Sequence, residues 1–186
     1  MNVIEEVRKL VEEECRRDTN VYGDGIWTNH ILSVVKFAKI LAEKANADQE
    51  IVELAALLHD LASIKDEHQH ANHHIFGAEE AERILKQFHY PKEKIEKIKH
   101  CIHAHRASQS VKRMTKEADC VANADAIAHF DNIPSLFYFA FVRQKMSIEE
   151  GTRWLRNKLQ RSWNKMTPEA KKIAKDKHEA SMILLK

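Results

Sequence analysis

The chain has 186 residues, 44% of them apolar, which is enough for one domain whose core needs no disulfides or structural metal. Its 30 basic and 28 acidic side chains give a net charge of +2, which argues against a general binder of nucleic acids or membrane surfaces. The three cysteines, Cys15, Cys101 and Cys120, form no CxxC pair, so the sequence indicates neither a disulfide framework nor a thiolate zinc site.

The N-terminal residues are charged throughout and lack the apolar core of a signal peptide, so we expect a cytoplasmic protein. The longest largely apolar run, residues 133–142, has ten residues, about half of what a bilayer crossing needs. We expect this run to form a buried helix or an interface, and a homodimer contact stays open.

Apolar residues at helical intervals predict three helices in the first third of the chain. His30 lies in the first turn of the second helix, and His59 and Asp60 lie in the last turn of the third. Residues 63–72 are rich in polar side chains and are expected to form a loop. The three helices cover residues 3–11, 27–42 and 51–61.

Two further helices, residues 75–85 and 91–102, are predicted in the middle of the chain, with His103 and His105 at the end of the second. Small residues dominate the next predicted helix, residues 118–127, which suits close packing. Asp125 falls within it, among alanines.

The last third of the chain is expected to contain a short aromatic helix over 134–141, a helix over 147–166 and a final helix from 167. The excess of basic residues in 151–186 is interpreted as a solvated face, and Trp154 and Trp163 fall at core spacing. No convincing strand pattern or Gly-rich phosphate loop is present. The sequence therefore predicts an all-α single domain covering residues 1–186.

Four polar residues lie beside apolar or alanine-rich runs on three predicted helices: His30, the doublet His59-Asp60, and Asp125. An ionised carboxylate in a core is unfavourable by several kcal/mol unless a cation or hydrogen-bond donors compensate it. Two imidazoles and two carboxylates form a ligand set for a divalent ion, with positions left for water. Taken alone, the doublet is better explained by a helix C-terminus with Asp60 turned to water.

The order of these residues resembles the H…HD…D signature of the HD superfamily of metal-dependent phosphohydrolases. One departure is Ser33, where the family often has Arg. The resemblance covers an HD-like core of about residues 27–127, onto which helices within 134–186 are expected to pack. The flanking segments that resemble the family are residues 30–38, 55–61, 74–85, 102–106 and 122–126.

The resemblance implies an HD-type helical bundle that binds one divalent ion, which is Mn, Mg, Co, Ni, Fe or Zn. Some family members bind a second ion, and the corresponding residues here are His74 and His105, with His103 as the competing choice. Contact with a substrate phosphate, or plain solvent exposure, explains these histidines as well. His68, His70 and His73 could form a secondary metal or phosphate site, but a polar loop explains them without a function. His129 matches no family segment and is expected to be structural. The four implied ligands of the first ion are His30, His59, Asp60 and Asp125.

The implied reaction is hydrolysis of a small phosphate ester or anhydride, with a nucleotide as the expected substrate, by a metal-activated water. Asp60 and Asp125 supply the charge that binds the ion. Lys65 and Arg106 are candidates for clamping the substrate phosphate, although exposed loop cations are common.

Two other functions stay open. The fold could serve as a catalytically silent module that binds metal or nucleotide, although four polar groups aimed inward argue against it. Alternatively, the protein could be a di-iron oxidase-type HD protein, which requires both His74 and His105 on a second iron. Metal content separates the oxidase from hydrolysis, because two irons favour the oxidase, and bound metal without turnover favours the oxidase or the binding module.

Overall fold

The computed structural model describes residues 2–106 and 111–186, and all regular elements in this part of the chain are helical. The predicted all-α fold is therefore confirmed. None of the described helices combines the length and apolarity needed to cross a bilayer. The elements are α1 (Val3–Cys15), η1 (Trp27–Ile31), α2 (Leu32–Ala45), α3 (Gln49–Leu58), α4 (Leu61–Lys65), η2 (Glu67–Asn72), α5 (His73–Gln87), α6 (Lys92–Ala104), α7 (Lys116–Asp131), α8 (Ile133–Phe137), η3 (Tyr138–Arg143), α9 (Ile148–Lys165) and α10 (Pro168–Leu184).

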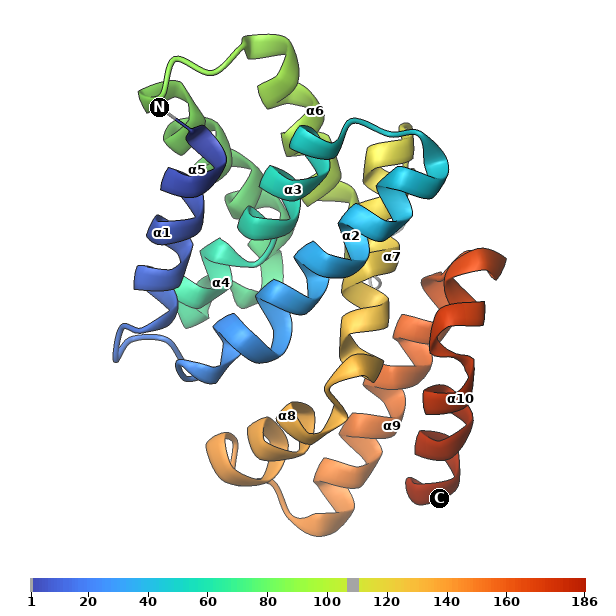
Figure 1. Cartoon of the computed structure of the whole chain (residues 1–186). Helices are drawn as coiled ribbons and strands as arrows, with labels where there is room; N and C mark the ends of the chain where they lie inside the picture. The colour runs from blue at the N-terminus through green and yellow to red at the C-terminus, as the bar shows by residue number, and fades with distance from the viewer. Residues whose placement is uncertain (1, 107–110) are drawn as a thin grey trace.

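Helix α7 runs through the middle of the molecule (Figure 1) and is buried on nearly every side, with twelve of its sixteen residues buried. Its alanines let neighbouring helices approach closely, as the small-residue pattern indicates. Helices α2, α3 and α6 pack on it, and α9 and α10 also contact it. Asp125 therefore lies where the N-terminal and C-terminal helices both reach.

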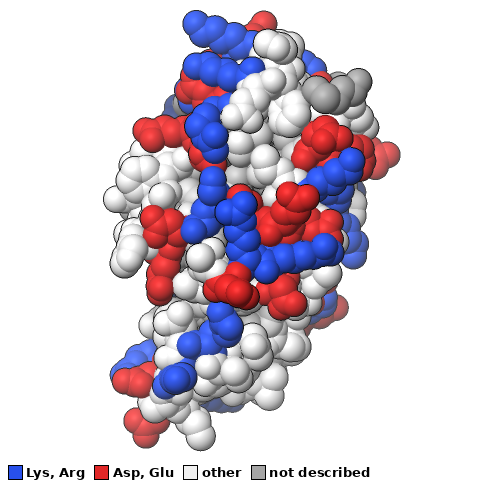
Figure 2. Space-filling view, turned by 90° about the vertical axis from the view of Figure 1, so that its left-hand side faces the viewer, with Lys and Arg blue, Asp and Glu red and all other residues white. Residues whose placement is uncertain are grey.

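The N-terminal helices form the larger part of the molecule, in which α1 packs on α3 and α4, and α5 packs on α6 (Figure 1). The helices α8, α9 and α10 lie together at the other end of α7. Acidic and basic side chains are interleaved over the face in Figure 2, in keeping with the balanced net charge.

The region of the doublet differs from the sequence expectation. Helix α3 ends at Leu58, so His59 and Asp60 form the junction with α4 rather than the last turn of one helix. The expected loop over residues 63–72 is wrong, because most of it lies in α4 and η2. Asp66 caps η2 by accepting a hydrogen bond from the backbone N–H of His68 at 2.9 Å.

The apolar run of residues 133–142 forms α8 and the π-helical segment η3. Ala140 is its buried residue, whereas Tyr138 and Val142 are 51% and 55% exposed. The run therefore does not form a fully buried helix, and a homodimer contact on it stays a prediction. The next helix, α9, begins with the predicted capping box, in which Ser147 and Glu150 bond each other's backbone.

Candidate metal centre

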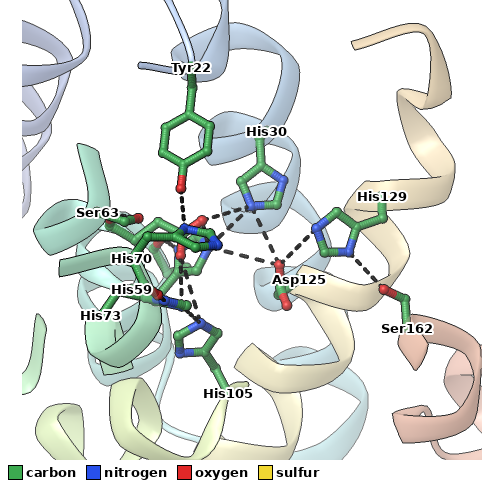
Figure 3. A network of polar contacts seen from close by, with 12 residues as sticks. Tyr22, His30, His59, Ser63, His70, His73, His105, Asp125, His129 and Ser162 are labelled. Carbon is green, nitrogen blue, oxygen red and sulfur yellow. Dashed lines mark hydrogen bonds and ion pairs between the residues drawn. The ribbon is translucent and has the colours of Figure 1, made fainter. Parts of the chain in front are cut away.

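The four residues of the predicted signature come from three separate places in the fold and lie close together; Figure 3 labels His30, His59 and Asp125. His30 lies in η1, a π-helical turn before α2, and such turns often occur at functional sites. His59 and Asp60 lie at the α3–α4 junction, and Asp125 lies on α7. His59 and Asp125 are buried, while His30 and Asp60 are partly exposed.

His30, His59 and Asp60 form one close group of ligand atoms, and Asp125 adjoins it, with its Oδ1 3.9 Å from His59 Nε2. His30 Nε2 lies 3.2 Å from His59 Nε2 and 3.4 Å from both Asp60 Oδ2 and Asp125 Oδ1. His59 Nε2 lies 3.3 Å from Asp60 Oδ2. Ligands held at about 2.1 Å from one ion are about 3.0–3.4 Å apart, so these spacings fit a shared cation. The structure thus brings together the four residues that the sequence singled out.

The second carboxylate oxygen of Asp60 faces another pair of histidines. Asp60 Oδ1 lies 3.3 Å from His73 Nε2 and 3.8 Å from His105 Nε2, and the two Nε2 atoms are 3.1 Å apart. One carboxylate therefore borders two groups of imidazoles. This arrangement fits two ions that share Asp60.

The sequence interpretation assigned this second position to His74, but the structure places His73 there. His74 stacks instead on His103, the alternative to His105, with ring centroids 5.4 Å apart. His73 is the first residue of α5, and one residue along a helix turns the side chain by about 100°. Sequence spacing could not separate adjacent histidines without the start of this helix.

Three of the histidines have the same internal orientation. In His59, His73 and His105, Nδ1 lies 2.5–2.8 Å from the carbonyl oxygen three residues earlier. A carbonyl only accepts, so Nδ1 donates and each Nε2 is directed at the centre, where it has a free lone pair whenever the ring is neutral. The lone pairs of His73 and His105 then face each other at 3.1 Å, a contact that repels unless a cation or a proton lies between them.

Burial and the neighbouring charges oppose each other at this centre. Burial disfavours the ionised carboxyl of Asp60, but the surrounding histidines hold its pKa well below the ordinary value. Burial likewise disfavours ionised Asp125, yet Lys165 and the histidines keep its pKa low. Burial lowers the pKa of His59, but Asp60 and Asp125 outweigh it and raise that pKa to about 9. The centre is therefore one where a positive charge is strongly favoured.

Two further side chains reach Asp125, and sequence reasoning assigned neither to the site. His129 Nε2 lies 3.6 Å from Asp125 Oδ1, and its Nδ1 lies 2.9 Å from Ser162 Oγ. Lys165 of α9 forms an ion pair with Asp125 Oδ2 and donates to the His105 carbonyl at 2.8 Å. The position of His129, four residues after Asp125 on one helix, was the available signal for it.

A cleft of about 1210 Å³ opens beside the centre, and its walls include residues 21–26, η2, η3 and α9. Arg106, one of the two predicted phosphate clamps, lines this cleft and donates to the Ala71 carbonyl. The other predicted clamp, Lys65, pairs instead with Glu80 at 2.6 Å and does not line the cleft.

Comparison with known proteins gives a family and a fold. A family model for the HD domain matches residues 27–129, more than half of the chain and close to the extent of the resemblance in the sequence. No match was found among curated proteins. Solved structures match over almost the whole chain, at identities that show the fold.

One similar structure is YpgQ from Bacillus subtilis in complex with ADP, with 24% identity, a TM-score of 0.72, and coverage of 98% of this chain and 93% of that chain. Another is an HD-superfamily hydrolase from Bacillus thuringiensis, with 21% identity, a TM-score of 0.69, and coverage of 98% and 92%. A protein from Lactobacillus plantarum has 16% identity, a TM-score of 0.73, and coverage of 98% and 93%.

Proposed function

The chain belongs to the HD domain superfamily, and from this premise we propose that it is a metal-dependent phosphohydrolase acting on a small phosphate ester or anhydride, with a nucleotide as its substrate. The observation that carries the proposal is the contact between His73 and His105 beside Asp60. Their Nε2 atoms face each other at 3.1 Å beside a carboxylate oxygen, which is the arrangement of donor atoms that a bound divalent ion needs.

The described residues offer places for two ions. Asp60 belongs to both sets, because its two oxygens face different histidines. When bound, a divalent ion supplies Lewis-acid chemistry, since it makes a water more acidic and offsets negative charge on phosphoryl oxygens. The mixed nitrogen and oxygen donors suit Mn, Mg, Co, Ni, Fe or Zn. The first ion would be held by His30, His59, Asp60 and Asp125, and the second by Asp60, His73 and His105.

The chain's own residues fix the geometry that hydrolysis needs. The Nδ1 bonds of His59, His73 and His105 to backbone carbonyls lock the rings so that Nε2 stays directed at the centre. Lys165 holds one oxygen of Asp125 and leaves the other for an ion. Arg106, at the wall of the cleft, is the cation that would contact a substrate phosphate.

A nucleotide substrate is supported by two observations. The cleft of about 1210 Å³ is large enough for a molecule of that size. The YpgQ structure, which shares this fold, is a complex with ADP. A nucleotide is accordingly the first compound class to test.

The test is elemental metal analysis, paired with phosphate release from nucleotides and simple phosphate esters on the same samples. Asp60→Asn and Asp125→Asn keep the side-chain shape but remove the charge. We expect both to lose metal and to lower metal-dependent phosphate release on the order of a hundredfold or more. Asp119→Asn, also on α7 but half-exposed and paired with Arg113, is the matched control. Full metal content and activity in Asp60→Asn protein would contradict the proposal.

The same samples decide between the alternatives. Two irons without phosphate release would favour the di-iron oxidase-type protein, in which the second iron lies at His73 rather than at the expected His74. Bound metal without turnover of any compound would favour the binding module.

A further inference from the structure

One face of α9 forms a wall of the cleft. Its residues recur at helical intervals from Trp154 to Lys165, so they form a single stripe along the helix. At a rise of 1.5 Å per residue this stripe is about 16 Å long. It lies outside residues 27–129, the part that matches the family model. The stripe consists of Trp154, Lys158, Arg161, Ser162 and Lys165.

The two ends of the stripe differ in chemistry. Lys165 pairs with Asp125 and therefore marks the end at the metal centre. Trp154 packs on Phe139, with ring centroids 5.6 Å apart, and Phe139 stacks on Tyr22 at 5.3 Å. All three aromatic residues line the cleft, so the far end offers flat apolar surfaces.

The middle of the stripe is cationic and lacks counterions. In the described part of the chain, neither Lys158 nor Arg161 has a carboxylate within 4.0 Å, although ion pairs occupy many of the other lysines and arginines. Lys158 is only partly exposed, and burial lowers its pKa. Lys158 Nζ lies 6.0 Å from the centroid of the Trp154 ring, and Arg161 is exposed, so no carboxylate among the described residues neutralises either charge. Two cations of this kind on one wall of the cleft favour an anionic ligand.

Accordingly, and resting on the proposed function, we infer that the α9 stripe makes the cleft selective for a nucleoside di- or triphosphate. The reacting phosphate lies at the His and Asp centre, the remaining phosphates contact Lys158 and Arg161, and the base packs on Trp154 and Phe139. A nucleoside monophosphate leaves the two cations without partners.

The experiment measures calorimetric binding of methylene-bridged analogues of ATP and ADP, of AMP, and of inorganic tripolyphosphate, with and without Mn²⁺. Lys158→Gln and Arg161→Gln should each lower the affinity for the ATP analogue roughly tenfold or more, but the affinity for AMP by less than about threefold. In the unmodified protein, tripolyphosphate should bind roughly tenfold more weakly than the ATP analogue, because it lacks a base. Arg153→Gln, on an exposed part of α9 away from the cleft, should change neither affinity.

The outcomes separate this inference from the proposed hydrolysis. Equal affinity for AMP and the ATP analogue, or equal weakening of both by Lys158→Gln and Arg161→Gln, overturns the inference whatever the protein hydrolyses. A preference for longer phosphate chains that both substitutions abolish supports it. If that preference occurs without metal-dependent phosphate release from any compound, the proposed hydrolysis is wrong while the polyphosphate site stands.

Discussion

At the scale of single residues, adjacent histidines have opposite surroundings. His73 presents Nε2 to Asp60 and His105, at 3.3 Å and 3.1 Å. His74 stacks on His103, and burial, with Arg106 as the next cause, lowers its pKa to about 4. His74 therefore stays neutral near pH 7 and does not contact the Asp60 carboxylate, whereas His73 lies against that carboxylate. Of the two, His73 is the one placed to complete the proposed second set of ligands.

Substituting these two residues separately tests the second ion. His73→Ala removes a nitrogen ligand, so we expect bound metal to fall from two ions toward one per chain, as measured by elemental analysis. His74→Ala is the matched control, because it changes a neighbouring, similarly buried residue of the same helix. Loss of metal in His74→Ala, with full occupancy in His73→Ala, would reverse the assignment.

At the scale of elements, the contact between η3 and α9 shapes the aromatic end of the cleft. Gly151, in the first turns of α9, lies directly under the ring of Phe141, and a Cβ added there would overlap that ring. One turn later on α9, Trp154 meets Phe139 of η3. The absence of a side chain at residue 151 therefore lets the two elements approach closely enough to form this end of the cleft.

Gly151→Ala should consequently be destabilising, although alanine is by itself more favourable than glycine in a helix, by about 1 kcal/mol. The overlap with Phe141 forces η3 to move, and we expect the free energy of unfolding to fall by about 1–3 kcal/mol. Urea unfolding measures this change. Asn157→Ala, at an exposed position of α9, is the control and should be neutral or slightly stabilising. A gain in stability in Gly151→Ala would show that the Phe141 ring leaves room for a methyl group at residue 151.

The helices and the signature residues could be predicted from the sequence, whereas the position of α9 at the cleft could not. Helical periodicity located most helices, and the signature located His30, His59, Asp60 and Asp125, because both are patterns along the chain. The role of α9 depends on packing. Polar residues on a basic helix look like a solvated face, and the docking of α9 beside α7 is what turns Lys158 toward the cleft.

At the scale of the whole molecule, the candidate centre exists only in the folded chain. Its candidate ligands come from η1, the α3–α4 junction, α5, the end of α6, and α7, and none of these segments holds a complete set. The fold places two ionised carboxylates, Asp60 and Asp125, among partly desolvated groups. A cation that binds there stabilises the folded state and has no comparable site in the unfolded chain.

Removal of metal should therefore lower the thermal stability of the whole protein. At an ion concentration a hundred times the Kd, linkage contributes about 2.7 kcal/mol, which for a chain of this length corresponds to a Tm about 5–10 °C higher than after chelation. Differential scanning calorimetry of chelator-treated protein, before and after adding Mn²⁺, measures the shift. Asp60→Asn should show almost none of this shift, because Asp60 is the one carboxylate in the described part of the chain that faces both sets of histidines. An equal shift in Asp60→Asn would mean that the stabilising ion binds elsewhere on the molecule.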